Sequence, residues 1–350
     1  MASSAKPVGV GFVGAGMIGQ VAHIANYREL PDCRAVALAE LRPALGRAAA
    51  AKFGVPKVYA SHRELLMDPE VQAVVVVTRR PATGPEVLEA LQAGRHVLSE
   101  KPMAHTVEQA QRLVDAAARK GVRYAVGYMK RHDPGTERAK ALLDELRASG
   151  ELGSILLLRA WCYGGEFRCD PADYVMTKED RPDGLATWPI APEWLPPALA
   201  EDYAWFLNVF VHDLNIVRHL SGTEPTVSSV DLRRRNGRFV GLDFGDYPGV
   251  LEMAEIPDQP WQEGVEILFE KGALRLQFRS PLEHNSARLT LQRAGGTREI
   301  PPDSAAWCFR RQAEAFIADI TQGREPLASG RDAVADLRLA EAIWRAHLKY

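Results

Sequence analysis

Three glycines near the N-terminus have the spacing of a loop that binds phosphate groups. The sequence GAGMIG at residues 14–19 follows an apolar run at residues 8–14 and precedes a stretch with helical spacing. The first glycine of such a loop allows a tight turn, the second lets the backbone approach a pyrophosphate, and the third lets helix and strand pack closely. The N–H groups and the positive dipole end of the helix then attract the anion. The predicted cofactor-binding residues of this loop are Gly14, Gly16, Met17, Ile18 and Gly19.

An acidic residue ends the next apolar run and indicates which dinucleotide is bound. Glu40 follows the glycine loop by about 20 residues, as the dinucleotide-binding pattern requires. A carboxylate at this position accepts hydrogen bonds from the ribose hydroxyls and repels a 2′-phosphate. Arg42, two residues later, is either a contact for such a phosphate or a solvated residue at a helix start. We predict NAD as the cofactor, with NADP as the less favoured alternative.

A lysine follows another apolar run, where a strand is expected to end. Residues 95–99 precede Glu100, Lys101 and Pro102. Ligands of a doubly wound sheet lie outside the carboxyl ends of its strands, so Lys101 is expected to face the nicotinamide. Pro102 disfavours helical geometry at Lys101 and favours an extended backbone. An ordinary solvated turn is the alternative interpretation.

The elements that must position these residues alternate regularly over the first 127 residues. Apolar runs rich in valine alternate with stretches in which apolar residues recur at helical spacing. This pattern predicts an α/β fold, with a Rossmann domain built on a doubly wound parallel sheet over residues 1–127. The expected strands are 8–14, 34–40, 71–78, 95–99 and 122–127, and the expected helices are 17–30, 43–53, 85–93 and 107–120.

Residues 128–350 have a different pattern, in which strand-like runs follow one another without helices between them. This pattern predicts a C-terminal α+β domain with a largely antiparallel sheet. The sequence leaves open whether the last helix, at about residues 331–348, packs back on the N-terminal domain. The expected helices are 136–148, 304–321 and 331–348, and the expected strands are 154–162, 226–234, 265–269, 273–278 and 287–293.

The composition argues against several classes of partner. The chain of 350 residues has a formal net charge of −2, which gives no electrostatic basis for binding nucleic acid or an anionic membrane. Its apolar runs fall short of the roughly 18 residues of a membrane span, and the N-terminus lacks the pattern of a signal peptide. The four cysteines form no C-x-x-C pair, so neither a metal site nor a disulfide framework is expected. We predict a cytoplasmic protein.

Several segments together resemble the Gfo/Idh/MocA oxidoreductase family. They are the glycine loop, Glu40, AGRHVLSEKPMA at residues 93–104 and GYMKRHDPG at residues 127–135. The family includes inositol dehydrogenases, glucose–fructose oxidoreductase and sugar-nucleotide dehydrogenases, and the resemblance extends over nearly the whole chain. It implies that Thr78 and Glu100 lie at the cofactor. Where the family often has Thr-Pro-x-x-x-His, this chain has TRRPAT at residues 78–83.

The resemblance also implies a catalytic group. The family's third motif matches residues 206–220, where Asn208 and His212 are four residues apart and hence on one helical face. By resemblance these two act with Lys101, although Asn208 replaces the usual aspartate and cannot take up a proton. His212 is the predicted general base, Lys101 stabilises the substrate oxygen, and Asn208 orients the substrate or His212. Hydride then passes from the secondary alcohol to nicotinamide C4.

The segment between Tyr163 and Phe206 indicates a substrate class. It is rich in proline and acidic residues and contains three tryptophans, and the family places this region beside the substrate. We expect a polyol, including one that bears amino groups, such as a cyclitol or an aminoglycoside precursor. A solvated loop is the alternative interpretation. The weaker substrate-binding candidates are Lys130, His132 and Trp205.

The resemblance admits other activities and an assembly. The same residues suit a ketosugar reductase, and the family also contains NAD-dependent glycosidases and a non-catalytic dinucleotide-binding regulator. Retention of Lys101 and His212 argues against the regulator. The open antiparallel sheet of the family often pairs between subunits, so we expect a homodimer or homotetramer.

Overall fold

The chain folds into two compact units, each assembled from separate parts of the sequence. The computed structural model describes all residues except 1–5, 168, 181, 183, 184 and 350. The predicted boundary after residue 127 is also a boundary between the units, but the chain later returns to the first unit twice. The first unit comprises Met1–Gly127, Asp170–Leu195 and Phe309–Val334, and the second comprises Tyr128–Cys169, Pro196–Cys308 and Ala335–Tyr350.

The first unit contains a six-stranded parallel sheet with the strand order β3-β2-β1-β4-β5-β6. Its central strands β1 and β4 are buried along their whole length, as expected for a sheet covered on both faces. This arrangement confirms the predicted Rossmann domain. The strands are β1 (Val8–Val13), β2 (Cys33–Ala39), β3 (Lys57–Tyr59), β4 (Ala73–Val76), β5 (His96–Ser99) and β6 (Tyr124–Val126).

Helices connect these strands, and one arrives from far along the sequence. The helix after the glycine loop begins with a wide π-type turn, a feature that recurs at functional sites. Phe316 and Ile317 of α8 join the core cluster that contains Val10 and Phe12, and burial of such a side chain contributes about 2–3 kcal/mol. The helical elements are η1 (Gly19–Ile24), α1 (Ala25–Tyr27), α2 (Pro43–Phe53), α3 (His62–Met67), α4 (Arg80–Gln92), α5 (Val107–Lys120) and α8 (Cys308–Gln322).

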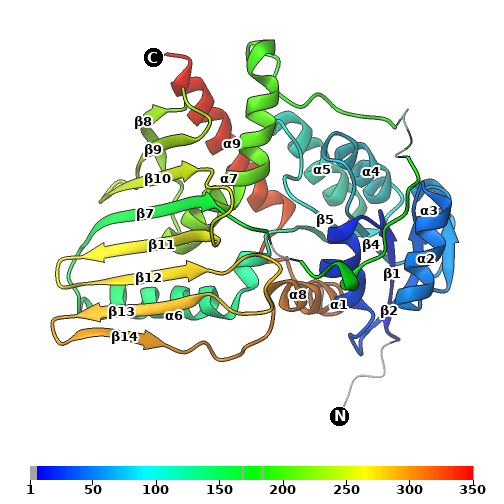
Figure 1. The fold of residues 1–350 in the computed structure, drawn as a ribbon, viewed down its shortest axis with the longest axis horizontal. Coiled ribbons are helices and arrows are strands. Elements are labelled where there is room, and N and C mark those ends of the chain that lie inside the picture. The colour runs from blue at the N-terminus through cyan, green and yellow to red at the C-terminus, as the bar shows by residue number, and fades with distance from the viewer. Residues whose placement is uncertain (1–5, 168, 181, 183–184, 350) are drawn as a thin grey trace. The chain divides into compact units, whose positions relative to one another are not determined.

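The second unit contains an eight-stranded sheet with the order β14-β13-β12-β11-β7-β10-β9-β8. Only the pairing of β7 with β10 is parallel among its described strands, which confirms the predicted antiparallel character. The strands, seen in Figure 1 from green to orange, are β7 (Ile155–Gly164), β8 (Thr226–Asp231), β9 (Gly237–Asp243), β10 (Pro248–Ala254), β11 (Gln262–Phe269), β12 (Gly272–Phe278), β13 (Arg288–Arg293) and β14 (Gly296–Ile300).

Helices pack against this sheet, with α6 against β12 and β13 and α7 against β7. The helix α7 is buried along most of its length, so its polar side chains must find partners inside the unit. Among the described helices, none combines the length and the apolar content needed to cross a bilayer. The helical elements are η2 (Met129–His132), α6 (Pro134–Ser149), η4 (Pro197–Leu199), α7 (Ala200–Ser221) and α9 (Gly330–His347), which belongs to this unit from Ala335 onward; η3 (Pro171–Asp173) lies in the first unit.

Candidate active site

The loop after β1 has the backbone that the glycine spacing predicts. Gly14 has a φ of 94°, and a Cβ atom there would lie 2.2 Å from the carbonyl oxygen of Val77. A Cβ at Gly19 would lie 2.6 Å from the carbonyl oxygen of Gly14, so the turn and the helix fit together only with glycine at both positions. A Cβ at Gly16 would meet open space, which leaves the backbone there accessible to a bound group. The loop therefore fits a pyrophosphate.

Glu40 binds this loop through its carboxylate. Its Oε2 atom accepts a hydrogen bond of 2.8 Å from the backbone N–H of Ala15. Arg42 donates three further bonds, from its backbone N–H and Nε to Oε1 and from Nη2 to Oε2, at 3.1, 2.8 and 3.1 Å. These four donors fill the roughly four lone-pair positions of a carboxylate. A ribose diol would therefore displace the guanidinium group of Arg42 when it binds Glu40.

Lys101 follows the end of β5, beside the carboxylate of Glu100. Glu100 forms a contact of 2.8 Å with Nε2 of His23 and accepts a bond of 3.2 Å from the backbone N–H of Lys101. Burial raises the pKa of Glu100, but the hydrogen bond and charge of His23 and the charge of Lys101 outweigh it, so that the pKa lies below its ordinary value. Glu100 is therefore ionised beside Lys101. The Lys101–Pro102 peptide bond is cis.

Arg80 and His105 also lie in this part of the first unit. Burial lowers the pKa of Arg80, although the charge of Glu100 acts in the opposite direction. Burial and the charge of Arg80 together lower the pKa of His105 to about 4, so its imidazole is neutral at physiological pH. Sequence reasoning found no role for His23 or His105, because nothing in local spacing connects them to Glu100 or Arg80.

Thr78 is held by Glu86, a buried acid in the middle of α4. Its hydroxyl donates to Oε2 of Glu86 at 2.5 Å and lies 3.2 Å from the hydroxyl of Thr83. Burial raises the pKa of Glu86. Thr83 stands where the family's histidine is expected, and it is buried. Thr78 is thus fixed directly after β4, at the carboxyl edge of the sheet.

The second unit carries His212 and Asn208 on α7. His212 is buried, and its ring meets the ring of Tyr128 edge to face at 6.2 Å between centroids. Asn208 is half-buried one helical turn earlier. Trp205 precedes Asn208 by three residues and therefore shares this stripe of the helix. Its ring lies 4.6 Å beneath the guanidinium group of Arg235.

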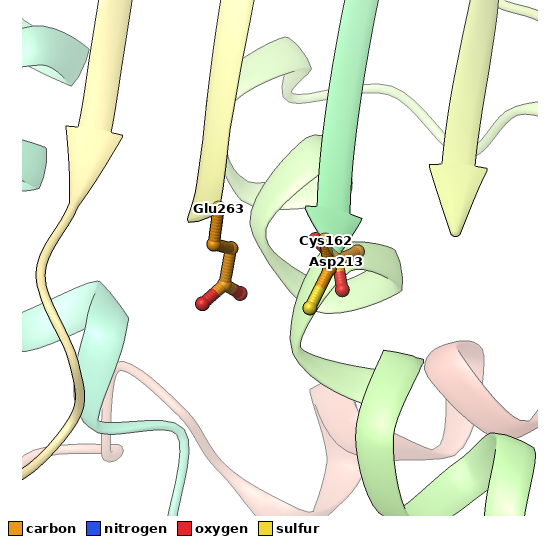
Figure 2. A group of neighbouring side chains, drawn as sticks. All are labelled: Cys162, Asp213 and Glu263. Atoms are coloured by element: carbon orange, nitrogen blue, oxygen red, sulfur yellow. The ribbon is translucent and has the colours of Figure 1, made fainter. Parts of the chain in front are cut away.

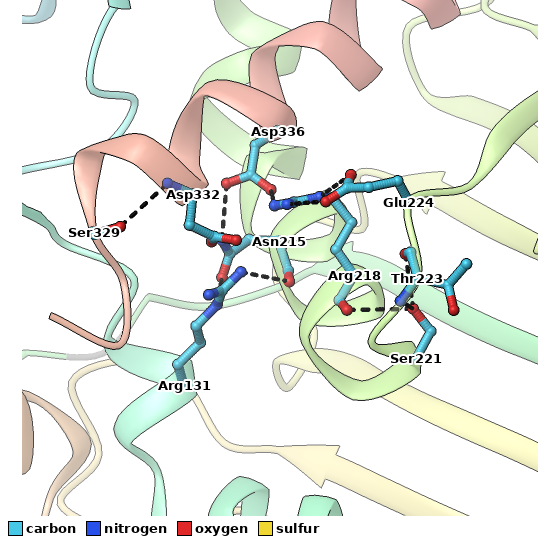
Figure 3. A network of polar contacts seen from close by, with 9 residues as sticks. All are labelled: Arg131, Asn215, Arg218, Ser221, Thr223, Glu224, Ser329, Asp332 and Asp336. Atoms are coloured by element: carbon cyan, nitrogen blue, oxygen red, sulfur yellow. Dashed lines mark hydrogen bonds and ion pairs between the residues drawn. The ribbon is translucent and has the colours of Figure 1, made fainter. Parts of the chain in front are cut away.

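A buried network fixes the next turn of α7 (Figure 3). Asn215 accepts a bond of 2.7 Å from Nε of Arg131 in η2 and donates one of 2.8 Å to Oδ2 of Asp336 in α9. Arg218 donates to Oδ1 of Asp336 at 2.6 Å and also binds Glu224 through two bonds of 2.7 and 2.5 Å. The network joins three helical elements of one unit and thereby sets the position of the helix that carries His212.

A second polar cluster surrounds Lys130. Its ammonium group forms an ion pair with Glu263, whose carboxylate lies together with Cys162 and Asp213 (Figure 2). The ligand atoms of these last three residues lie within 4.8 Å of one another, and all are buried. Burial, followed by the charge of Glu263, raises the pKa of both Asp213 and Cys162. The cluster thus consists of the Lys130–Glu263 ion pair with the carboxyl group of Asp213 and the thiol of Cys162 buried beside it.

The structure divides the predicted catalytic residues between the two units. Lys101 belongs to the first unit, and Asn208 and His212 belong to the second. Of the weaker candidates, Lys130 and His132 are buried in η2, and Trp205 lies on α7. The placement of Asn208 and His212 on one helix is as their spacing predicts, while the meeting of Lys101 with His212 stays a prediction.

Comparison with known proteins identifies relatives of the chain. The family model described as the oxidoreductase family with an NAD-binding Rossmann fold, GFO_IDH_MocA, matches residues 8–128. Inositol 2-dehydrogenase of Burkholderia cenocepacia is 36% identical over 271 residues, which cover 72% of this chain and 74% of that protein. The uncharacterized oxidoreductase YrbE of Bacillus subtilis is 24% identical over 221 residues, which cover 63% of this chain and only 56% of YrbE.

The fold also occurs in solved structures. The 3-ketoreductase KijD10 of Actinomadura kijaniata, in complex with NADP and TDP-benzene, has a TM-score of 0.76 and 20% sequence identity. The superposition covers 97% of this chain and 98% of that chain. At this identity the likeness concerns the fold. The family model assigns residues 8–128 to an NAD-binding Rossmann fold, while the KijD10 complex contains NADP, so the comparisons do not select between the two dinucleotides.

Proposed function

Because the chain belongs to the Gfo/Idh/MocA oxidoreductase family, we propose that it oxidises a secondary hydroxyl group of a sugar, cyclitol or amino-sugar substrate with NAD. The observation that carries this proposal is the loop at residues 14–19, which has no room for a Cβ atom at Gly14 or Gly19 and whose Ala15 N–H is bound by Glu40. The relationship to inositol 2-dehydrogenase supports a polyol as the substrate class.

The residues present divide into those that hold the cofactor and those that act on the substrate. The glycine loop, Glu40, Thr78 and Glu100 would hold the dinucleotide, and when bound its nicotinamide supplies the hydride acceptor. His212 removes the hydroxyl proton, for which a neutral imidazole is suited near neutral pH. Lys101 donates to the same oxygen and stabilises its developing negative charge.

Four other residues position this chemistry. Asn208 orients the substrate or His212 through hydrogen bonds, since an amide cannot accept the proton itself. Glu100 and His23 hold the backbone that carries Lys101. Trp205 lies on the same stripe of α7 as Asn208 and His212, with Arg235 over one face of its ring, and we rank it above Lys130, which is paired with Glu263.

The experiment is a screen of sugars, cyclitols and aminoglycosides for NADH formation at 340 nm, repeated with NADP. With the substrate found, His212→Ala and Lys101→Met are each expected to lower kcat at least a hundredfold while NAD binding is kept. His219→Gln, seven residues farther along α7, is the matched control and is expected to keep near-normal kcat. Near-normal turnover by either of the first two variants would refute the assignment.

The screen also separates the alternatives. The same residues run in reverse would reduce a ketosugar, and the 3-ketoreductase KijD10 shares the fold. NADH consumption with ketosugars but no NADH formation from polyols would select the reductase. Hydrolysis of glycosides with NAD retained and not consumed would select a glycosidase, and nucleotide binding without any turnover would select a regulator. We further propose a cytoplasmic homodimer or homotetramer, for which light scattering gives the mass.

A further inference from the structure

The N-terminus of α2 lies directly beyond Glu40 and would ordinarily attract an anion. The helix begins at Pro43, which has no N–H group, and its first free donors are the N–H groups of Ala44 and Leu45. Such donors, together with the positive end of the helix dipole, form a ready site for phosphate. With the ribose bound to Glu40 as proposed above, a phosphate on its 2′-oxygen would be directed to this helix end.

The carboxylate of Glu179 occupies this helix end. Its two oxygens accept hydrogen bonds of 2.8 Å each from the N–H groups of Ala44 and Leu45. Thr177 donates a third bond, at 3.0 Å, from its hydroxyl group. These backbone bonds, and to a smaller extent the charge of Arg47, lower the pKa of Glu179, so the group is ionised. The N–H of Arg42 already donates to Glu40.

Glu179 is held there by a segment that arrives from the middle of the chain. Residues 170–195 belong to the first unit although they follow β7 of the second. Before Glu179, the backbone of Val175 exchanges two bonds with the side chain of Gln20, at 2.7 and 2.9 Å. After Glu179, Pro182 accepts a bond of 3.0 Å from Arg79, and the N–H of Trp188 donates one of 2.9 Å to Pro81.

These attachments lie on both sides of the glycine loop. Gln20 follows the loop directly, and Arg79 and Pro81 follow β4, the neighbour of β1 in the sheet. The segment packs tightly against α4 at Trp188, because a Cβ atom at Gly84 would lie 2.2 Å from the ring of Trp188. These contacts hold Glu179 at the N-terminus of α2 within the first unit.

We propose that Glu179 is a specificity-determining residue that excludes the 2′-phosphate of NADP by occupying the helix end where that phosphate would bind. The inference rests on the proposed dinucleotide binding and extends it. A 2′-phosphate carries a charge of about −1.5 to −2 at neutral pH. It would meet two carboxylates, Glu40 and Glu179, and the backbone donors at this helix end are already engaged. NAD lacks the phosphate and meets no such conflict.

The test measures nucleotide binding directly by isothermal titration calorimetry of the full-length chain with NAD and with NADP. Glu179→Gln keeps the size of the side chain but removes its charge, and it is expected to raise the affinity for NADP relative to NAD at least tenfold. The affinity for NAD itself is expected to stay within about threefold. Glu193→Gln, which removes an exposed charge from the same segment, is the control and is expected to leave the ratio unchanged.

Every outcome is informative, because binding is scored independently of turnover. The inference would be overturned if the ratio of NADP affinity to NAD affinity in Glu179→Gln stayed within threefold of the wild-type ratio, or if Glu193→Gln changed that ratio equally. Either result would leave the proposed function intact. Binding of neither nucleotide to the wild type would overturn both. Nucleotide binding that responds as expected, in a protein that oxidises no polyol, would overturn the proposed reaction alone.

Discussion

Asp336 connects the catalytic helix α7 to α9, and its replacement by alanine tests whether the buried network positions His212. Asp336 is 0% exposed and accepts bonds of 2.6 Å from Arg218 and 2.8 Å from Asn215. Removing one partner of a buried ion pair costs about 3–5 kcal/mol. Arg218 keeps its second partner, Glu224, while the amide of Asn215 loses its acceptor at a cost of about 1–3 kcal/mol.

We therefore expect Asp336→Ala to lower the free energy of unfolding by about 3 kcal/mol, near the lower end of the range for buried pairs. For a unit of this size the midpoint of thermal unfolding would fall by about 6–12 °C. Urea unfolding followed by tryptophan fluorescence gives the free energy, and circular dichroism gives the midpoint. Because Asn215 lies three residues after His212 on α7, kcat is expected to fall as well.

The matched control removes the other partner of Arg218. Glu224 is 64% exposed, so Glu224→Ala is expected to cost less than about 1 kcal/mol and to leave kcat near normal. A loss below about 1 kcal/mol for Asp336→Ala would refute the reasoning, as would an equal loss for the two variants. Either result would mean that apolar packing, and not the polar network, sets the position of α7.

Two further predictions concern the glycine loop and the pH dependence of stability. Gly14→Ala places a Cβ atom 2.2 Å from the carbonyl oxygen of Val77 at a φ of 94°, and we expect the free energy of unfolding to fall by at least about 2 kcal/mol. Gly16→Ala, with open space around its Cβ, should keep its stability and weaken NAD binding in titrations. Equal stability losses would contradict this. Burial raises the pKa of Asp133 from its ordinary 3.8 to about 6, although three backbone N–H groups oppose the shift. The folded state therefore binds this proton more tightly than the unfolded state, and the wild type loses stability as pH rises from about 4 to about 6. In urea unfolding, the stability of Asp133→Asn relative to the wild type should therefore rise by up to about 3 kcal/mol between pH 4 and 7. A stability difference that stays constant with pH would exclude the effect.

Apart from β3, the strands of the first unit were predictable because each is a short apolar run flanked by helical spacing. The missed elements had weaker signals. β3 has only three residues at the edge of its sheet, and β9, β10 and β14 mix charged residues and glycine with apolar ones. The helix expected at 85–93 begins at Arg80, because Pro81 occupies its first turn, a position where a missing N–H costs nothing.

In the second part of the chain, local sequence patterns do not predict which segments come together. Residues 170–195 have little periodicity, and they were expected to border a substrate pocket in the C-terminal domain. Their membership of the first unit depends on hydrogen bonds such as those between Gln20 and Val175, which are 155 residues apart. The core position of Phe316 in α8 likewise depends on packing against β1, some 300 residues earlier.

The sequence by itself determined the Rossmann domain, the glycine loop, the acid at Glu40 and the shared helical face of Asn208 and His212, because these depend on neighbours within a few residues. Only the tertiary structure decided that Glu179 occupies the N-terminus of α2, that His23 supports Glu100 and that Asp336 holds Asn215. These pairs are 135, 77 and 121 residues apart. Which polar groups meet over such separations follows from the packing of whole elements, since each buried donor or acceptor must find a partner within hydrogen-bond distance.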